Sequence, residues 1–298
     1  MQRISLLLAG FAPAALWGQQ GAGTELWRVA ATTLPLPPAL GTGGAAVFWN
    51  PAQPAIPERA SIALELIETA PTVGASDLIT TARVRVRPLG QVGLVYGRMG
   101  IGDLVRTSLS PDPDPGTIPY YTQTLGATWG VALGGGGTAF GATLAYQQTH
   151  LDAAQSTRWT LDVGARRSFS DAVTLAAATH FFSRFTTGDA AQELYGAVEV
   201  RVWHGPLWGT RGAVRGRYGI ATAHGFSADH QFGAGFELGP QFGCDLLVER
   251  EGSYGRPGWR AVTGVRVGVG RYGVSFARDF GVNDIGAAYR VGLEGRVP

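Results

Sequence analysis

Short segments that alternate apolar and polar residues repeat from about Ala60 to the end of the chain. Tight connections and longer polar connections join these segments in strict rotation, as expected for hairpins of paired strands. Alternation with a period of two residues, without any long apolar helix, is typical of strands that cross a membrane in a closed barrel. This feature therefore constrains both the fold of most of the chain and the compartment in which it works.

The segment 78–88 shows the alternation most clearly, because arginine occupies every second position of ARVRVR, 82–87. Similar segments bring the total to about fourteen strands, and bacterial outer-membrane barrels have even strand numbers. We therefore predict an all-β fold: a transmembrane up-and-down antiparallel β-barrel of about 14 strands. Tight turns are expected near Ser170–Asp171, His204–Pro206, Gly239–Pro240 and Arg271–Tyr272.

The two faces of the predicted strands differ in chemistry, and this difference leaves two architectures open. In a water-soluble sandwich, two sheets would bury their apolar faces against each other. In a membrane barrel the apolar faces would contact lipid, because a barrel of about fourteen strands is too wide for side chains to fill. Aromatic residues near strand ends are typical of a membrane interface and favour the barrel. These residues are Trp129, Trp159, Trp203, Trp208, Tyr218 and Trp259.

The N-terminus has the pattern of an export signal. Arg3 precedes the apolar run Ile4–Leu16, which is too short for a transmembrane helix and is typical of a secretory signal peptide. We predict a signal peptide over 1–18, with a buried N-terminal helix as the alternative. Residues 19–59 are rich in proline and glycine and are expected to form a compact irregular segment, followed by the barrel over 60–298. Export and barrel together predict the bacterial outer membrane.

Composition excludes some classes of partner and site. The net charge of +2 gives no indication of a nucleic-acid partner. Cys244 is the single cysteine, so the chain has no intramolecular disulfide and lacks the cysteine clusters of zinc sites. No metal site and no cofactor are predicted.

Many charged residues fall on the face of the strands that would line the barrel lumen. We expect them to form ion pairs and hydrogen bonds around a water-filled interior; a cationic constriction that selects anions is the alternative. The predicted lumen charges are Glu65, Arg83, Arg85, Arg87, Asp162, Glu199, Arg211, Arg215, Arg217, Asp245, Glu249, Arg260, Arg266, Asp279, Arg290, Glu294 and Arg296.

No catalytic constellation stands out in the sequence. A barrel hydrolase needs a histidine and a serine side by side, and only His180, with Ser183 nearby, falls inside a predicted strand. A single histidine in a strand is more often an ordinary lumen residue, so we predict a non-enzyme. Asp112 and Asp114 alternate with prolines in a long loop and are interpreted as solvated, with weak calcium binding as the alternative.

The stretch before the first strand, LGTGGAAVFWNPA over 40–52, resembles a signature of the long-chain fatty-acid transporter (FadL-like) superfamily and its PorV/PorQ-like members. The resemblance implies fourteen strands and an N-terminal plug inside the lumen, with Asn50, Pro51 and Ala52 in that plug. It also implies a kink that opens the wall at the third strand. Gly97, Gly100 and Gly102 fall in that strand, where glycine permits bends.

These patterns lead to two hypotheses about function. The first is passive transport of small, hydrophobic molecules across the outer membrane, past a displaced plug. The second is a PorV/PorQ-like barrel that does not transport but binds or shuttles exported proteins. The expected partners are outer-membrane lipid, a hydrophobic small-molecule ligand and an exported protein.

Overall fold

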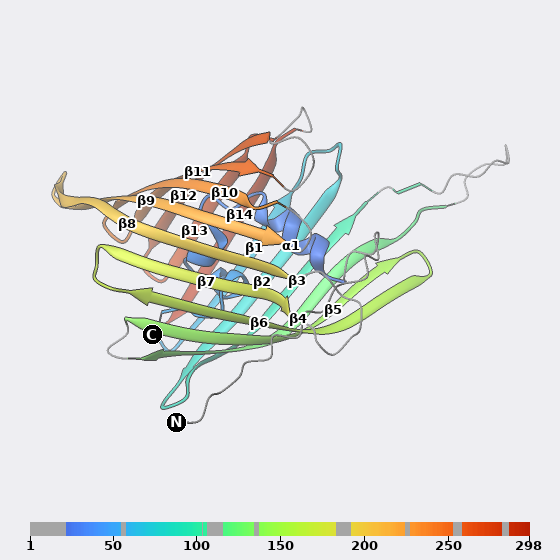
Figure 1. Cartoon of the computed structure of the whole chain (residues 1–298), viewed down its shortest axis with the longest axis horizontal. Coiled ribbons are helices and arrows are strands. Elements are labelled where there is room, and N and C mark those ends of the chain that lie inside the picture. The colour runs from blue at the N-terminus through green and yellow to red at the C-terminus, as the bar shows by residue number, and fades with distance from the viewer. Residues whose placement is uncertain are drawn as a thin grey trace, which may run out of the picture.

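The computed structural model describes residues 22–54, 58–102, 104–105, 116–133, 137–182, 192–223, 227–252, 258–281 and 286–298. The predicted signal peptide, 1–18, and the aspartates of the long loop lie outside the described residues. The strands form one closed antiparallel barrel, in which each pairs with its neighbours in sequence order and β1 pairs with β14 (Figure 1). The prediction of fourteen strands in an up-and-down barrel is confirmed.

The strands are β1 (Ala60–Glu68), β2 (Ala75–Val86), β3 (Gly90–Ile101), β4 (Tyr120–Leu133), β5 (Thr138–Leu151), β6 (Ala154–Ser168), β7 (Val173–Phe182), β8 (Glu193–Leu207), β9 (Thr210–Ala223), β10 (Asp229–Leu238), β11 (Phe242–Glu251), β12 (Gly258–Val269), β13 (Tyr272–Asp279) and β14 (Ala288–Val297). The connections that follow the even-numbered strands are short and share one end of the barrel, called the turn end here. The connections that follow the odd-numbered strands share the other end, called the loop end; they are longer, except that β5 and β6 are joined by residues 152–153 alone.

The outer face of the barrel is apolar. In β1, Ile62 is 56% exposed and Leu66 is 49% exposed, whereas the residues that follow each of them, Ala63 and Ile67, are buried. Side chains along a strand alternate between its two faces, so the exposed residues point away from the barrel and the buried ones point into it. An outer wall of exposed Leu, Val, Phe and Trp side chains fits hydrocarbon and not water.

Residues 22–54, called the N-terminal segment below, lie inside the barrel. They form α1 (Thr24–Ala31), the 3₁₀-helix η1 (Pro38–Leu40) and α2 (Ala46–Trp49), drawn in blue within the ring of strands (Figure 1). Helix α1 contacts β3 and β4, and η1 contacts β7 and β8. No helix in the described residues is long and apolar enough to span a membrane.

The N-terminal segment carries an aromatic core that packs on the inner wall. Trp27 of α1 stacks on Phe48 of α2, with ring centroids 3.8 Å apart, and meets Phe181 of β7 edge-on at 5.3 Å. The inner wall facing this core is itself apolar at Ile79 and Met99, which are fully buried. Burial of these rings stabilises the position of the segment, since each aromatic side chain removes a large apolar area from water.

The third strand, in which a kink is predicted at Gly97, Gly100 and Gly102, is regularly paired up to Ile101, and the kink stays a prediction. Strand β3 pairs with β2 and β4 without any register shift, and both Gly97 and Gly100 have partners in each ladder. A Cβ at Gly97 would lie 2.7 Å from Cδ2 of Leu26, so this glycine makes room for α1. Gly102 lies just beyond the strand, which ends at Ile101.

Irregular pairing occurs at two other places. The β6–β7 ladder shifts between Leu161 and Val163, and the β8–β9 ladder shifts between Arg201 and Trp203. The second bulge accompanies an error in the predicted turns: residues 204–206 belong to β8, and the turn follows at Trp208–Gly209. Gly209 has a positive φ of 78°, which glycine adopts without strain.

Candidate functional site

A row of glycines on the inner wall holds the end of the N-terminal segment. Gly130 of β4, Gly141 of β5 and Gly164 of β6 are register partners in turn, so they lie side by side across three strands. The chain at Pro51 crosses them so closely that a Cβ at Gly141 would lie 2.2 Å from the Pro51 carbonyl oxygen. Only glycine allows the two backbones to approach this far.

Asn50 fixes the chain above this glycine row. Its side-chain amide donates to the carbonyl oxygen of Ala39 at 2.8 Å, and its Oδ1 accepts from the backbone N–H of Ala52 at 2.9 Å. A Cβ at Gly164 would lie 2.0 Å from the same Oδ1. The motif Asn50, Pro51 and Ala52, which was singled out from the sequence, is therefore completely buried and packed against the wall.

The bulge between β6 and β7 brings two consecutive side chains into the interior. His180 and Phe181 are both buried, and Phe181 has a positive φ of 59°. Asp162, opposite the bulge, accepts from the Phe181 N–H at 2.9 Å and lies 3.3 Å from Nδ1 of His180. The bulge thus presents a histidine and an aromatic ring to the N-terminal segment, instead of one side chain.

Wall arginines contact both ends of α1. Arg158 of β6 donates to the carbonyl oxygen of Ala22 at 2.7 Å, and Arg290 of β14 donates to the carbonyl oxygen of Ala30. Arg290 also donates to Thr33 at 3.0 Å and pairs with Glu65 at 2.7 Å. The charge of Arg290 lies at the C-terminal end of the helix, where the helix dipole favours a cation.

A second contact between the segment and the wall is made by prolines. A Cβ at Gly264 of β12 would lie 2.6 Å from Cγ of Pro35, and a Cβ at Gly219 of β9 would lie 2.7 Å from Cβ of Pro37. The stretch between α1 and η1 therefore packs against the wall of the barrel on the side opposite the glycine row.

Paired charges line the strands on this second side. Arg217 donates to Glu199 at 2.6 Å and to Asp245 at 2.5 Å, and Arg215 joins Glu199 to Glu237. Each carboxylate lies beside a guanidinium, so these residues form the predicted ion-pair network and not a stripe of bare cations. In the part of β8, β9, β10 and β11 that the structure describes, these paired charges do not form a cationic constriction.

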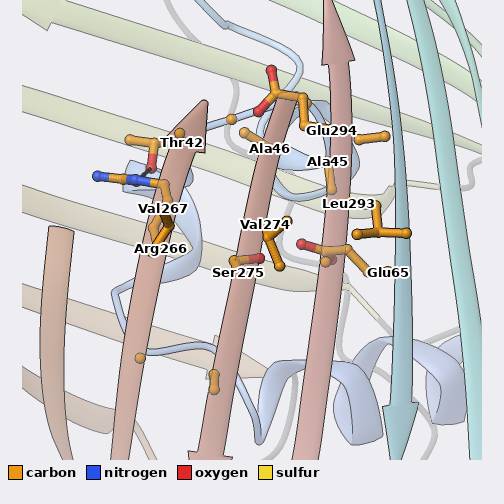
Figure 2. A pocket seen from close by; sticks show the side chains of 18 of the residues that line it. Thr42, Ala45, Ala46, Glu65, Arg266, Val267, Val274, Ser275, Leu293 and Glu294 are labelled. Atoms are coloured by element: carbon orange, nitrogen blue, oxygen red, sulfur yellow. Dashed lines mark hydrogen bonds between the residues drawn. The ribbon is translucent and has the colours of Figure 1, made fainter. Parts of the chain in front are cut away.

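A cavity of about 320 Å³ lies between the N-terminal segment and the inner wall of β12, β13, β14 and β1 (Figure 2). The segment contributes apolar residues, among them Leu34, Leu36 and Trp49. The wall is lined by small residues, Gly264, Ser275 and Gly292 being examples, and it therefore leaves room for a solute.

Charged and polar groups stand around this cavity, as Figure 2 shows. Arg266 donates to Thr42 Oγ1 at 2.8 Å, Glu65 pairs with Arg290, and Glu294 lies on β14 beside the segment. The cavity thus combines apolar contact from the segment with polar groups at its edge, a combination typical of small-molecule sites.

The predicted lumen charges have two different positions. Most are buried or half-buried inside the barrel: Glu65, Arg83, Arg85, Asp162, Glu199, Arg215, Arg217, Asp245, Glu249, Arg260, Arg266, Asp279, Arg290 and Glu294. Arg87, Arg211 and Arg296 are exposed instead, because they stand at or beyond strand ends at the turn end. Arg296 still pairs there with Glu294 at 3.0 Å.

Sequence reasoning missed the residues that join the wall to the segment. Arg158 and Trp27 were not singled out, the prolines were interpreted only as a barrier to regular structure, and His180 was interpreted as an ordinary lumen residue. The sequence did contain one signal: Ile67 follows Leu66 directly and breaks the alternation. An apolar side chain on the inner face indicates that another apolar part of the chain packs against the wall there. In the described residues, no group of three or more His, Cys, Asp or Glu side chains is arranged to hold a metal ion.

The fold resembles that of solved outer-membrane proteins. The toluene transporter TbuX of Ralstonia pickettii matches with a TM-score of 0.56 at 11% identity, over 94% of this chain and 99% of that chain. The outer membrane protein Omp33 of Acinetobacter baumannii matches with a TM-score of 0.47 at 10% identity, over 80% and 98%. No family model matches the chain, and no curated protein matches its sequence. The chain has the fold of a bacterial outer-membrane β-barrel.

Proposed function

We propose that this protein is a passive, non-enzymatic channel of the bacterial outer membrane, closed at rest by its N-terminal segment. The observation that carries this proposal is the cavity between the segment and β12, β13, β14 and β1. The cavity lies on the turn-end side of Pro35, which packs closely against Gly264 of β12. A shift of the stretch around Pro35 and Pro37 would connect the cavity with the loop end of the lumen.

The proposed solute is small and mainly hydrophobic. Leu34, Leu36 and Trp49 offer apolar contact inside the cavity, and its volume of about 320 Å³ is at the lower end of the range for small-molecule sites. Toluene transport by TbuX gives a precedent on the same fold. The resemblance of 40–52 to the FadL-like superfamily supports the same substrate class.

Vesicles with a phosphorylated glycolipid in the outer leaflet test the proposal, because such a leaflet slows the entry of apolar solutes. Uptake of benzyl alcohol is compared between vesicles with the purified barrel and empty vesicles. Faster uptake into the barrel-containing vesicles is expected. Equal rates would mean that the barrel does not conduct hydrophobic solutes.

Two residues of neighbouring strands provide a matched pair of variants. Ser275 of β13 lines the cavity, whereas Val291 of β14 does not line it and is 42% exposed on the outer face. Ser275→Phe fills the cavity and is expected to slow uptake severalfold, while Val291→Phe faces lipid and is expected to leave uptake unchanged. Equal effects of the two substitutions would show that solute does not pass through this cavity.

A second function is favoured by the dense anchoring of the segment. Buried contacts at Asn50, His180 and Arg290 hold it in place, as a barrel with a permanently closed lumen would require. Such a barrel would serve as a platform that binds an exported protein at the cell surface. Recovery of an exported protein by affinity capture from intact cells, together with no solute uptake, would favour this function over transport.

A further inference from the structure

The outer face of β3 to β6 changes character abruptly toward the loop end. One row of register partners crosses the outer face of these four strands: Tyr96, Leu125, Tyr146 and Trp159. It is called the aromatic row here, because three of its four side chains are aromatic. Two residues further toward the loop end, the same strands carry the polar row Arg98, Gln123, Gln148 and Thr157. Such a step from aromatic to polar residues marks the boundary of the hydrocarbon.

Arg98 is held in a stack above this boundary. Its guanidinium carbon lies 4.4 Å from the ring centroid of Tyr121, and the Tyr121 ring stacks on His150 with centroids 5.0 Å apart and planes at 17°. Beside the stack, the Gln123 amide donates to Gln148 at 2.6 Å. An arginine stacked on a ring keeps the N–H groups at its edges free to bind an anion in a fixed geometry.

Other strands also carry arginines that point outward near their ends. Arg250 and Arg278 also point outward, and each lies next to the loop end of its strand. Arg278 lies over the rings of Phe280 and Tyr289 at 4.9 and 5.7 Å. Arg167 is the counterpart at the turn end, where its guanidinium lies 4.9 Å from the ring of Phe169.

We propose that the cluster of Arg98, Tyr121 and His150, with Gln123 and Gln148 beside it, binds a phosphate group of a phosphorylated glycolipid in the outer leaflet. The longer connections of outer-membrane barrels face the cell exterior, so this cluster stands at the headgroup level of that leaflet. The inference rests on the outer-membrane location and is independent of transport.

Charge and geometry favour a phosphate headgroup as the occupant. The planar guanidinium of Arg98 presents two parallel N–H groups, which match two phosphate oxygens. The amides of the glutamine pair offer further hydrogen bonds to phosphate or sugar oxygens. The aromatic row and the apolar wall beneath it continue toward the membrane centre, where the acyl chains of the same lipid lie.

Native mass spectrometry of the purified full-length barrel in detergent tests the proposal, with a phosphorylated glycolipid as the probe. The same lipid after enzymatic removal of its phosphates is the reference. We expect the phosphorylated lipid to bind at least tenfold more tightly than the dephosphorylated lipid. Arg98→Gln is expected to weaken binding of the phosphorylated lipid about tenfold, because a charge-assisted hydrogen bond is lost. Arg98→Lys keeps the charge but loses the stacked fork, and an intermediate affinity is expected.

Arg167→Gln is the matched control, because it removes an outward, ring-stacked arginine at the opposite end of the barrel. Its affinity for the lipid is expected to equal that of the wild type. If Arg98→Gln does not fold, Tyr121→Ala tests the same cluster by releasing the guanidinium from its ring. Equal binding of the dephosphorylated lipid, equal losses at Arg98 and Arg167, or full displacement by equimolar inorganic phosphate would each overturn the proposal.

Discussion

The imidazole Nε2 of His180 in β7 lies 2.7 Å from the backbone carbonyl oxygen of Trp49 in α2. A carbonyl oxygen only accepts hydrogen bonds, so Nε2 carries the hydrogen in this contact. The other ring nitrogen lies 3.3 Å from the carboxylate of Asp162. His180 therefore connects the wall of the barrel to the N-terminal segment at a completely buried point.

Replacement of His180 by alanine is expected to loosen the N-terminal segment. The substitution leaves the Trp49 carbonyl buried without its partner, which costs about 1–3 kcal/mol. Urea unfolding in lipid vesicles measures this loss, and planar-bilayer recording is expected to show more frequent open events. His204→Ala, an exposed histidine of β8, is the control and is expected to change neither property. If His180→Ala matches the wild type in both assays, the contact does not hold the segment.

A methyl group at Gly141 is expected to displace the chain at Pro51. The new Cβ would lie 2.2 Å from the Pro51 carbonyl oxygen, which is far closer than atoms in contact allow. A cysteine placed at Ala52, in a Cys244→Ala background, reports the displacement by its reaction with a water-soluble maleimide. Ala52 is fully buried, so the parent is expected to be unreactive and the Gly141→Ala variant reactive.

Gly216→Ala is the control for this experiment, because its Cβ would meet its nearest neighbour at an ordinary 3.6 Å. The cysteine at position 52 is expected to stay unreactive in that variant. Reactivity in both variants, or in neither, would contradict the close packing of the segment on the glycine row.

The ion pair between Arg290 and Glu65 is expected to contribute more to the free energy of unfolding than an exposed ion pair at the edge of the barrel. Arg290→Met leaves the Glu65 carboxylate without its guanidinium partner in the interior, and breaking a buried pair costs about 3–5 kcal/mol. Arg296→Gln removes an exposed pair with Glu294 and is expected to cost less than about 1 kcal/mol. Urea unfolding of both variants measures the difference. Equal losses would show that Arg290 is not a buried anchor.

A charge on the outer face is expected to destabilise the barrel according to its depth. Leu144 is 50% exposed on the outer face of β5, and arginine there costs about 2–4 kcal/mol if it reaches the middle of the bilayer. Gln148 lies on the same face four residues nearer the loop end, where arginine costs about 0–1 kcal/mol. Unfolding free energies in vesicles measure both substitutions. A similar cost at the two positions would contradict the assignment of the hydrocarbon boundary.

The wall of the barrel was predictable from the sequence because its signal is local and repeated. Alternation along segments such as 78–88 gave the strand number, and it identified most of the inward charges but not the exposed positions of Arg87, Arg211 and Arg296. The N-terminal helices were not expected, since prolines and glycines around α1 obscured a short helix that is stabilised by packing against the wall and not by its own propensity.

The remaining differences arise from contacts between residues that are distant in sequence. Gly97 also makes room for Leu26, and no local pattern contains that pairing. The bulge at Phe181 likewise depends on Asp162 across the ladder. The glycine row under Asn50 emerges only once the register of β4, β5 and β6 is known.

Accessibility of spin labels at Val84 and Arg85 tests the central assignment most directly, namely lipid outside the wall and a polar lumen inside it. Val84 is 47% exposed on the outer face of β2, and Arg85 is the next residue on the inner face. Labels are placed singly in a Cys244→Ala background, in lipid bilayers. The label at position 84 is expected to respond to oxygen and not to a water-soluble nickel chelate, and the label at 85 is expected to show the reverse. A nickel response at 84, or the same response at both positions, would contradict the membrane barrel described above.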